Sequence, residues 1–244
     1  MQCTIYNSNA SIRLEIHNIV KKVKQIQSLE VYELPNFELL EMQRCSLFKP
    51  LSMLLLVPIP RKGDIMNICV FCSSSDSTPF IYKIAAEELG QQIATRGHSL
   101  VFGGGNVGLM HEIAQSALQS GGKAIGVIPE YLRSKEQRFD KVDELIITDT
   151  IHERKALMIE KADAFIVLPG GWGTMEEFFE IAAAKFRDND PRIIALLNTA
   201  GFYNQLFAFF NFLSHETFLS PQWRDSFYIS EKVCDILDYI ENNS

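Results

Sequence analysis

The stretch DAFIVLPGGWGTMEEFFE places three glycines, a threonine and two glutamates directly after a short apolar run. The run from Ala164 to Leu168 is typical of a strand buried on both faces, and the residues from Thr174 onward are typical of a helix. A glycine loop between a strand and a helix N-terminus binds anions, because backbone N–H groups and the positive end of the helix dipole face the ligand. Phosphate is the natural ligand. Thr174 and Glu177 also fit the capping-box pattern, so an ordinary sharp turn is the alternative.

A second stretch, TDTIHERKALMIEK, carries two adjacent basic residues, Arg154 and Lys155. Thr150 and Glu153 form a capping box that predicts a helix start, which places both basic residues in the first turn. Positive charge there opposes the helix dipole and therefore calls for a partner, such as a substrate phosphate or a carboxylate. A solvated surface pair is the alternative.

Two further loops carry groups that could bind a nucleotide. Gly103, Gly105 and Gly108 match G-x-G-x-x-G, and Glu130 follows at about the spacing of a ribose-binding acid, which keeps an NAD-type oxidoreductase open. The loop follows a second predicted strand rather than the first, and this motif alone is weak evidence. The other loop, CSSSDS, offers the hydroxyl and backbone donors of Ser73–Ser75, or is an ordinary serine-rich turn.

These loops need elements that bring them together, and the alternation of strands and helices from Met66 onward provides them. Helices are predicted after Thr78 and Pro79 and around GLMHEIAQSAL. The predicted strands are NICVFCS, HSLVF, KAIGVIP, DELIIT, DAFIVLP and RIIALLN. This order predicts an α/β fold with a Rossmann-like doubly wound parallel sheet in three α/β/α layers. The three loops would then share one polar crevice at the carboxyl ends of the strands.

Composition narrows the function classes. The chain has 244 residues, 47% of them hydrophobic, which suits one α/β domain of ordinary size. A formal net charge of -7 argues against a nucleic acid partner. The 5 cysteines suggest a reducing, cytoplasmic compartment rather than a disulfide framework. Cys69 and Cys72 lie three apart in a predicted strand and so point to opposite faces, and we expect no metal site.

The N-terminal part of the chain differs from the rest. Residues 1–65 are predicted to form an extension and 66–244 the folded domain, which we expect to start at Met66. The extension contains an amphipathic helical stripe, which could bind a partner or lie on its own domain, formed by Ile12, Ile16, Ile19, Val23 and Ile26. The apolar stretch LSMLLLVPIP is shorter than the ~20 residues of a membrane span, so no membrane association is expected.

Three stretches together resemble a known family. HERKALMIEKADAFIVLPGGWGTMEE, FGGGNVGLM and GVIP are similar to the LOG (lonely guy) family of cytokinin riboside 5'-monophosphate phosphoribohydrolases, with the pattern MHxRK followed by PGGxGTxEE. The resemblance covers about Met66 to Asn198. It implies hydrolysis of the N-glycosidic bond of a nucleoside 5'-monophosphate, without a cofactor. Many relatives have been labelled lysine decarboxylases, but nothing in this sequence would seat pyridoxal phosphate.

The resemblance also implies residue roles. Arg154 and Glu177 match the family's catalytic arginine and glutamate. The residues expected near the substrate phosphate and ribose are Ser74, Gly104, Lys155, Gly171, Gly173, Thr174 and Glu176. A homodimer is implied, with Arg133 and Arg138 as candidates for completing the partner's base pocket.

This chain departs from the family pattern at three places. Ser73 replaces the glycine of Cys-Gly-Ser-Ser, His111 stands where a glycine is usual, and Ala184–Arg187 replace a W-x-Q-L stretch. We therefore expect AMP to serve as readily as a cytokinin nucleotide. The alternatives are a non-catalytic carrier of a nucleotide or phosphorylated cofactor and, less favoured, the NAD-type oxidoreductase.

Overall fold

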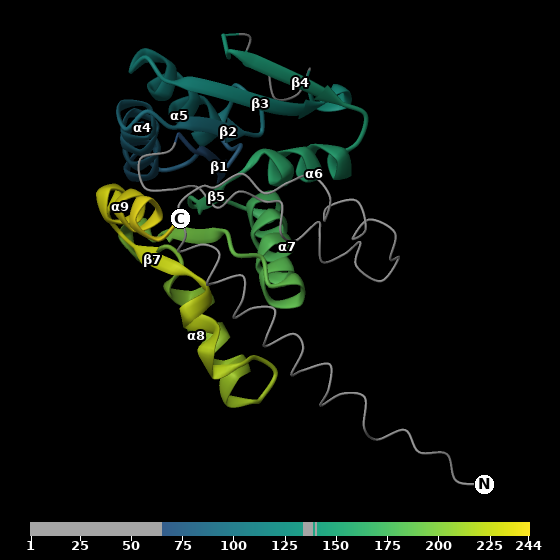
Figure 1. Ribbon diagram of the computed structural model, residues 1–244, viewed down its shortest axis with the longest axis vertical. Coiled ribbons are helices and arrows are strands. Elements are labelled where there is room, and N and C mark those ends of the chain that lie inside the picture. The colour runs from purple at the N-terminus through teal and green to yellow at the C-terminus, as the bar shows by residue number, and fades with distance from the viewer. Residues whose placement is uncertain (1–64, 134–138, 140) are drawn as a thin grey trace, which may run out of the picture. The chain divides into compact units, whose positions relative to one another are not determined.

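The computed structural model describes residues 65–133, 139 and 141–244. Apart from Ile65, the predicted extension lies outside the described residues, as does Arg138. The described strands form a 7-stranded sheet (Figure 1). They are β1 (Asn67–Phe71), β2 (Ser99–Phe102), β3 (Lys123–Pro129), β4 (Glu144–Thr148), β5 (Ala164–Val167), β6 (Ile193–Leu197) and β7 (Tyr228–Ser230).

The sheet is doubly wound. Its strand order is β4-β3-β2-β1-β5-β6-β7, and each of these neighbouring pairs is parallel. The direction of winding reverses between β1 and β5, so the helices that follow these two strands cover opposite faces of the sheet, and ligands bind at such a switch point in folds of this kind. The predicted fold class is confirmed.

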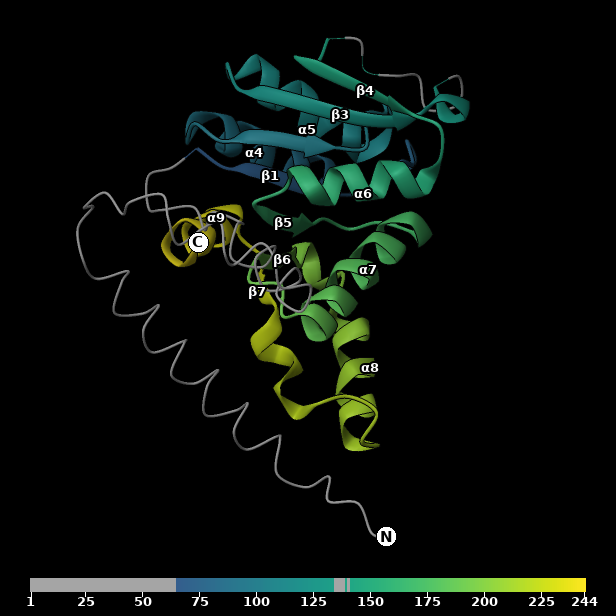
Figure 2. The same cartoon turned by 45° about the vertical axis from the view of Figure 1, so that its right-hand side comes forward.

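Helices cover both faces of the sheet, which gives the three predicted layers (Figure 2). One face carries α4 (Phe80–Thr95), α5 (Gly108–Gln119) and α9 (Val233–Asn243), and the other carries α6 (Ile151–Lys161), α7 (Trp172–Asp188) and α8 (Asn204–His215). Short 3-10 turns span Glu130–Leu132, Thr199–Gly201 and Pro221–Ser226. Because both faces are covered, β2 and β5 are buried along their whole lengths.

Alternate residues of each strand feed two separate hydrophobic cores. In β1, Ile68 and Val70 pack under α4, α5 and α9, whereas Cys69 and Phe71 pack under α6, α7 and α8. Cys72 belongs to the first core and Cys69 to the second, so the prediction that these thiols face opposite ways is confirmed. Cys69 and Cys72 therefore cannot form a disulfide bond with each other or bind the same metal ion.

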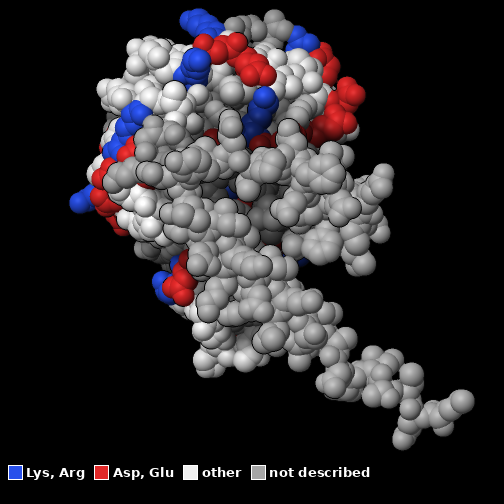
Figure 3. Space-filling view, viewed as in Figure 1, with Lys and Arg blue, Asp and Glu red and all other residues white. Residues whose placement is uncertain are grey.

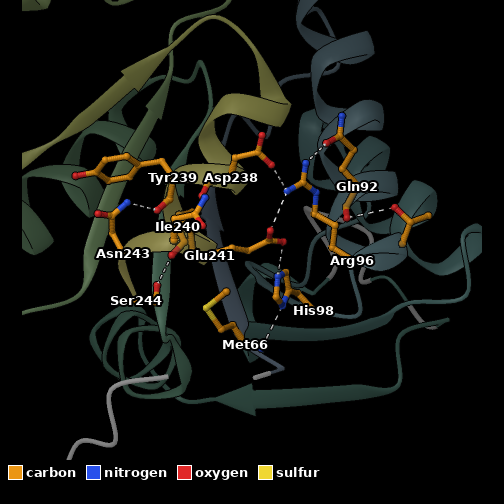
Figure 4. Close-up of polar contacts among 12 residues, drawn as sticks. Met66, Gln92, Arg96, His98, Asp238, Tyr239, Ile240, Glu241, Asn243 and Ser244 are labelled. Carbon is orange, nitrogen blue, oxygen red and sulfur yellow. Dashed lines mark hydrogen bonds and ion pairs between the residues drawn. The ribbon is translucent and has the colours of Figure 1, made fainter. Parts of the chain in front are cut away.

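A polar network holds the C-terminal helix at the amino edge of the sheet (Figure 4). The Arg96 guanidinium lies 2.6 Å from Asp238 Oδ1 and 3.1 Å from Glu241 Oε2. His98 Nδ1 accepts a hydrogen bond from the Met66 N–H at 3.3 Å, so Nε2 carries the proton and donates to Glu241 at 3.1 Å. The network joins α9 to the end of α4 and to the beginnings of β1 and β2.

Charged side chains of both signs lie near one another on one face of the described residues. Figure 3 shows lysine and arginine side chains beside aspartate and glutamate side chains there. None of the helices in that part is both long and apolar enough to cross a membrane.

Candidate active site

Ser73 joins the three predicted loops at the carboxyl edge of the sheet. Its N–H donates to the carbonyl of Pro169 at 3.3 Å, and its carbonyl accepts from the N–H of Leu109 at 2.9 Å. The loops that follow β1, β2 and β5 therefore meet at one place. This place is the switch point between β1 and β5, where ligands bind in doubly wound sheets.

The loop after β2 leads into α5, and the first N–H groups of this helix are hydrogen-bonded by other residues of the protein. Gly108 has φ +55°, and a Cβ there would stand 2.6 Å from the backbone carbon of Ser74, so only glycine fits. Its N–H donates to Asp76 Oδ1 at 2.8 Å, while the next N–H, on Leu109, is bound by Ser73. A carboxylate of the protein thus occupies the place that a pyrophosphate takes in a dinucleotide-binding fold.

The start of α7 is arranged differently. The helix begins at Trp172, with Gly171 in the N-cap position, and no side chain of the described residues caps it. The alternative interpretation of Thr174 and Glu177 as a capping box at the helix start is therefore wrong. The glycine loop enters the helix two residues earlier than expected, and Thr174 lies inside the first turn, buried, with its hydroxyl against Gly170.

Packing within the described part of the protein does not require glycine at positions 171 and 173. A Cβ at either position would meet no described atom within 4 Å, and neither residue has a positive φ. The neighbouring Trp172 side chain is 94% exposed. The glycines therefore leave open space directly in front of an uncapped helix N-terminus, which is the arrangement that binds a phosphate group.

The helix that carries the basic pair begins as predicted. Thr150 Oγ1 accepts from the Glu153 N–H at 3.1 Å, and Glu153 Oε2 accepts from the N–H of Asp149 at 3.0 Å. This capping arrangement fixes the start of α6 at Ile151 and places Arg154 and Lys155 next to each other on its buried side.

Arg154 is buried and lies against the β2 loop. It is 8% exposed, and its Nε atom has no hydrogen-bond partner among the described residues. A Cβ on Gly103 would overlap its Nη2 atom, so the glycine makes room for the guanidinium. A buried donor without an acceptor costs free energy unless a ligand supplies one.

Glu177 lies on the same side of the sheet as Arg154 and is 9% exposed. Both residues act on the thiol of Cys69 in the middle of β1. Burial raises the pKa of Cys69 well above its usual value, the negative charge of Glu177 raises it further, and the positive charge of Arg154 opposes this rise. The two charged side chains thus lie within electrostatic range of one buried atom, below the switch point.

Lys155 has two carboxylate partners on the neighbouring helix. Its Nζ atom lies 2.7 Å from Glu176 Oε1 and 2.8 Å from Glu180 Oε2. Burial lowers the pKa of Lys155, but the hydrogen bonds and negative charges of Glu176 and Glu180 together outweigh this effect and raise it. The hydrogen bond from Lys155 lowers the pKa of Glu176. Direct contact of Lys155 and Glu176 with a substrate stays a prediction.

Ser74 and Gly104 lie in different loops and differ in exposure. Ser74 is exposed in the serine loop, whereas Gly104 is buried with φ +72°. The Gly104 carbonyl accepts from the Phe139 N–H at 3.0 Å. Arg133, a candidate for the partner's base pocket, pairs with Glu130 at 2.6 Å within its own chain.

Two of the departures from the family pattern lie at different distances from the glycine loops. His111 is in the first turn of α5, with Nδ1 2.6 Å from Asn106 Oδ1 in the glycine loop. Ala184–Arg187 lie in the last turns of α7, a helix of 17 residues, so about 20 Å separates them from the loop of their own chain. There Lys185 donates to the carbonyl of Arg192 at 2.7 Å.

Sequence reasoning missed two residues that shape the site. Asp76 caps α5 from another loop, and the hydroxyl of Tyr203 donates to the carbonyl of Leu168, just before the glycine loop, at 2.6 Å. Their partners are 32 and 35 residues away, so no local motif could have shown them. Among the described residues, no group of three or more His, Cys, Asp or Glu side chains could hold a metal ion.

Comparison with known proteins shows what this chain is similar to. A family described as "Possible lysine decarboxylase" matches residues 110–240. The probable cytokinin riboside 5'-monophosphate phosphoribohydrolase LOGL5 of Oryza sativa subsp. japonica is 39% identical over 175 residues, 72% of this chain and 71% of that protein. The cytokinin riboside 5'-monophosphate phosphoribohydrolase LOG1 of Arabidopsis thaliana is 40% identical over 163 residues, 67% of this chain and 76% of that protein.

Solved structures share the fold. The molybdenum cofactor carrier protein of Chlamydomonas reinhardtii is 25% identical with a TM-score of 0.57, and the match covers 73% of this chain and 98% of that one. The molybdenum cofactor binding protein of the phototrophic bacterium Rippkaea orientalis is 26% identical with a TM-score of 0.53, over 73% of this chain and 97% of that one.

Proposed function

The chain belongs to the LOG family of cytokinin riboside 5'-monophosphate phosphoribohydrolases, and from that premise we propose that it hydrolyses the N-glycosidic bond of nucleoside 5'-monophosphates. Water adds to the anomeric carbon of the ribose, the bond to the base nitrogen breaks, and the base leaves with a proton. The products are the free base and ribose 5-phosphate. AMP and cytokinin riboside 5'-monophosphates are the proposed substrates.

The 5'-phosphate binds at the start of α7. Gly171 and Gly173 leave space there, and the first-turn N–H groups and the helix dipole supply positive potential. Thr174 adds a hydroxyl inside the same turn. Ser74 and Gly104 line the neighbouring loops, so the phosphate is held where the loops after β1, β2 and β5 meet.

The chemistry requires stabilisation of a positively charged, oxocarbenium-like ribose. Glu177 contacts the ribose hydroxyls or the attacking water, and its negative charge offsets the charge that develops at the anomeric carbon. Arg154 binds substrate oxygens and orients Glu177. Neither role needs a metal ion or an organic cofactor.

The observation that carries this proposal is the buried Arg154 guanidinium, whose Nε lacks an acceptor among the described residues. It lies beside Gly103 and within range of the same buried thiol as Glu177. A substrate oxygen in the crevice would supply the missing acceptor. A purely structural arginine would be expected to have all its donors bound within the protein.

The second candidate function is a carrier that binds a nucleotide or phosphorylated cofactor without cleaving it. The observation in its favour is the likeness to molybdenum cofactor carrier and binding proteins over 73% of the chain. The NAD-type oxidoreductase has less support, because Asp76 and Ser73 already bind the N–H groups at the start of α5.

A homodimer is part of the proposal. Helix α8 is apolar on two sides, since Phe207 and Phe210 are buried while Phe209 and Phe212 are 52% and 57% exposed. Further exposed aromatic side chains are Phe179 and Phe186 on α7 and Phe218 after α8. Exposed aromatic side chains on two neighbouring helices are typical of a protein interface, and a second copy of the chain is the proposed occupant. A cytoplasmic location stays a prediction.

The deciding experiment measures base release by chromatography from AMP, isopentenyladenosine monophosphate, GMP, CMP and unphosphorylated adenosine. Release that requires the 5'-phosphate and is lost in the Glu177→Gln variant supports the hydrolase and identifies the preferred base. Binding of nucleotides without any base release would favour the carrier instead.

A further inference from the structure

We infer that Lys155 is a positioning residue, whose ammonium group clamps α6 to α7 and thereby holds Arg154 and Glu177 at their working separation. The inference rests on the proposed function, because it concerns how that function's two catalytic side chains are kept in register. It replaces the expectation that Lys155 contacts the substrate directly.

The clamp joins the two helices at the residues next to the catalytic ones. Lys155 follows Arg154 in α6, and Glu176 precedes Glu177 in α7. Its ammonium group lies 2.7 Å from Glu176 and 2.8 Å from Glu180, which are one helical turn apart. A single buried cation thus fixes both the distance and the rotation of α7 relative to α6.

The distribution of burial suits a clamp better than a ligand contact. The Lys155 side chain is 7% exposed, while those of Glu176 and Glu180 are 57% and 44% exposed. One cation with two carboxylates leaves a net negative charge. A substrate phosphate at this cluster would therefore meet two carboxylates and one ammonium group that is already bound, which is unfavourable.

Without the ammonium group of Lys155, we expect α7 to shift relative to α6. Glu176 and Glu180 would be like charges at i and i+4 of α7, and they would repel each other. Both would then turn toward solvent, and α7 would lose its tie to α6. Since catalysis is sensitive to misplacement of reacting groups by about 1 Å, turnover should fall while substrate affinity is kept.

The test compares kcat and KM for AMP in the full chain and three variants. They are Lys155→Met, Glu180→Gln and, as a matched control on the same helix, Lys161→Met, whose ion pair to Glu144 at 3.5 Å does not involve α7. We expect Lys155→Met to lower kcat about 30-fold and Glu180→Gln about fivefold, with KM within about threefold of wild type. Lys161→Met should match wild type.

Two kinetic results would overturn the inference. A rise in KM of about tenfold or more at unchanged kcat in Lys155→Met would place the ammonium group on the substrate phosphate. Unchanged kcat and KM in both Lys155→Met and Glu180→Gln would show that the Lys155 ion pairs have no role in positioning the catalytic residues. Because Lys155 is buried and its variant could unfold, the exposed Glu180→Gln variant keeps the test decisive.

A second measurement needs no turnover and separates this inference from the proposed function. A double-mutant cycle of Lys155→Met and Glu180→Gln in urea unfolding should show that the two changes are not additive. Additive changes would overturn the clamp whatever the wild-type rate. Failure of the wild type to release any base would count against the hydrolase and leave the clamp to be judged by this cycle.

Discussion

The guanidinium of Arg154 lies so close to Gly103 that a methyl group at position 103 would overlap its Nη2 atom. The glycine of the β2 loop is therefore part of the arginine's binding pocket, although it carries no functional group. The same Cβ would stand 2.9 Å from Met110 Sδ, which is on the following helix.

The Gly103→Ala variant should lose base release about 100-fold or more, because the added methyl group displaces the Arg154 guanidinium. Steady-state release of adenine from AMP measures the effect. The control is the same change in an Arg154→Ala background, where it should have no further effect. A full additional loss in that background would show that Gly103 acts by some other route.

Glu177→Gln should lower kcat by at least about 100-fold, since the amide keeps the shape of the side chain but not its charge. Its unfolding free energy should stay within about 1 kcal/mol of wild type. Rates and urea midpoints should be compared with those of Glu160→Gln, an exposed glutamate on α6. Retained turnover in a folded Glu177→Gln protein would refute the assigned role.

Gly173→Ala should stabilise the protein and weaken phosphate binding at the same time. Position 173 is helical and a Cβ there meets no described atom within 4 Å, so alanine should add about 0.4–1 kcal/mol to the unfolding free energy. The same methyl group would enter the proposed phosphate site and raise KM for AMP. Thermal unfolding tests the expected gain in stability, and KM for AMP tests the expected loss of phosphate binding. An unchanged KM would mean that the phosphate binds elsewhere.

Phe212→Glu should convert the proposed dimer to a monomer, because it buries a charge in the apolar face of α8. Light scattering after size exclusion gives the mass. Phe80→Glu on α4, at a phenylalanine that is 70% exposed on the other side of the sheet, is the matched control and should remain dimeric. A wild-type monomer would end this proposal directly.

The ion pair of Glu176 predicts a dependence of stability on pH. The hydrogen bond from Lys155 lowers the pKa of Glu176 from its usual 4.5. A carboxyl with a lowered folded-state pKa contributes stability that is fully present above pH 4.5 and is lost as the pH falls through the lowered pKa. Glu176→Gln should therefore reduce the unfolding free energy near neutral pH, and this difference should shrink in acid.

Urea unfolding of wild type and Glu176→Gln over a series of pH values provides the measurement. In a Lys155→Met background the stabilising contribution of Glu176 should be lost, and repulsion from Glu180 should make the pH-dependent difference change sign. A difference of constant size from neutral to acidic pH would contradict the ion-pair explanation.

The strands could be predicted because each is a continuous apolar run that ends at a glycine, proline or polar residue. Predicted and observed β3 agree at both ends, Lys123 and Pro129, and β1 and β5 differ only by flanking residues. Strand β7 has only three residues, all half-buried, so its sequence shows no apolar run that would predict a strand. Helices α8 and α9 were also not predicted.

The site could be predicted only in part, for a physical reason. The meeting of the three loops follows from the topology, and the capping of α6 is a local pattern that Thr150 and Glu153 display in sequence. The partners of Lys155 are on another helix, and Thr174 imitates a cap at a helix start that Gly171 sets two residues earlier. Contacts between distant elements leave no periodic signal in the sequence.

The fastening of α9 at the amino edge of the sheet bears on how the chain folds during synthesis. Met66 precedes the central strand, yet its N–H is bound by His98, whose other nitrogen binds Glu241 near the C-terminus. A chain still on the ribosome has β1 long before its neighbour β5, and Glu241 is synthesised later than both strands. Until β5 is synthesised, one edge of β1 is unpaired, and an unpaired strand edge can pair with other chains.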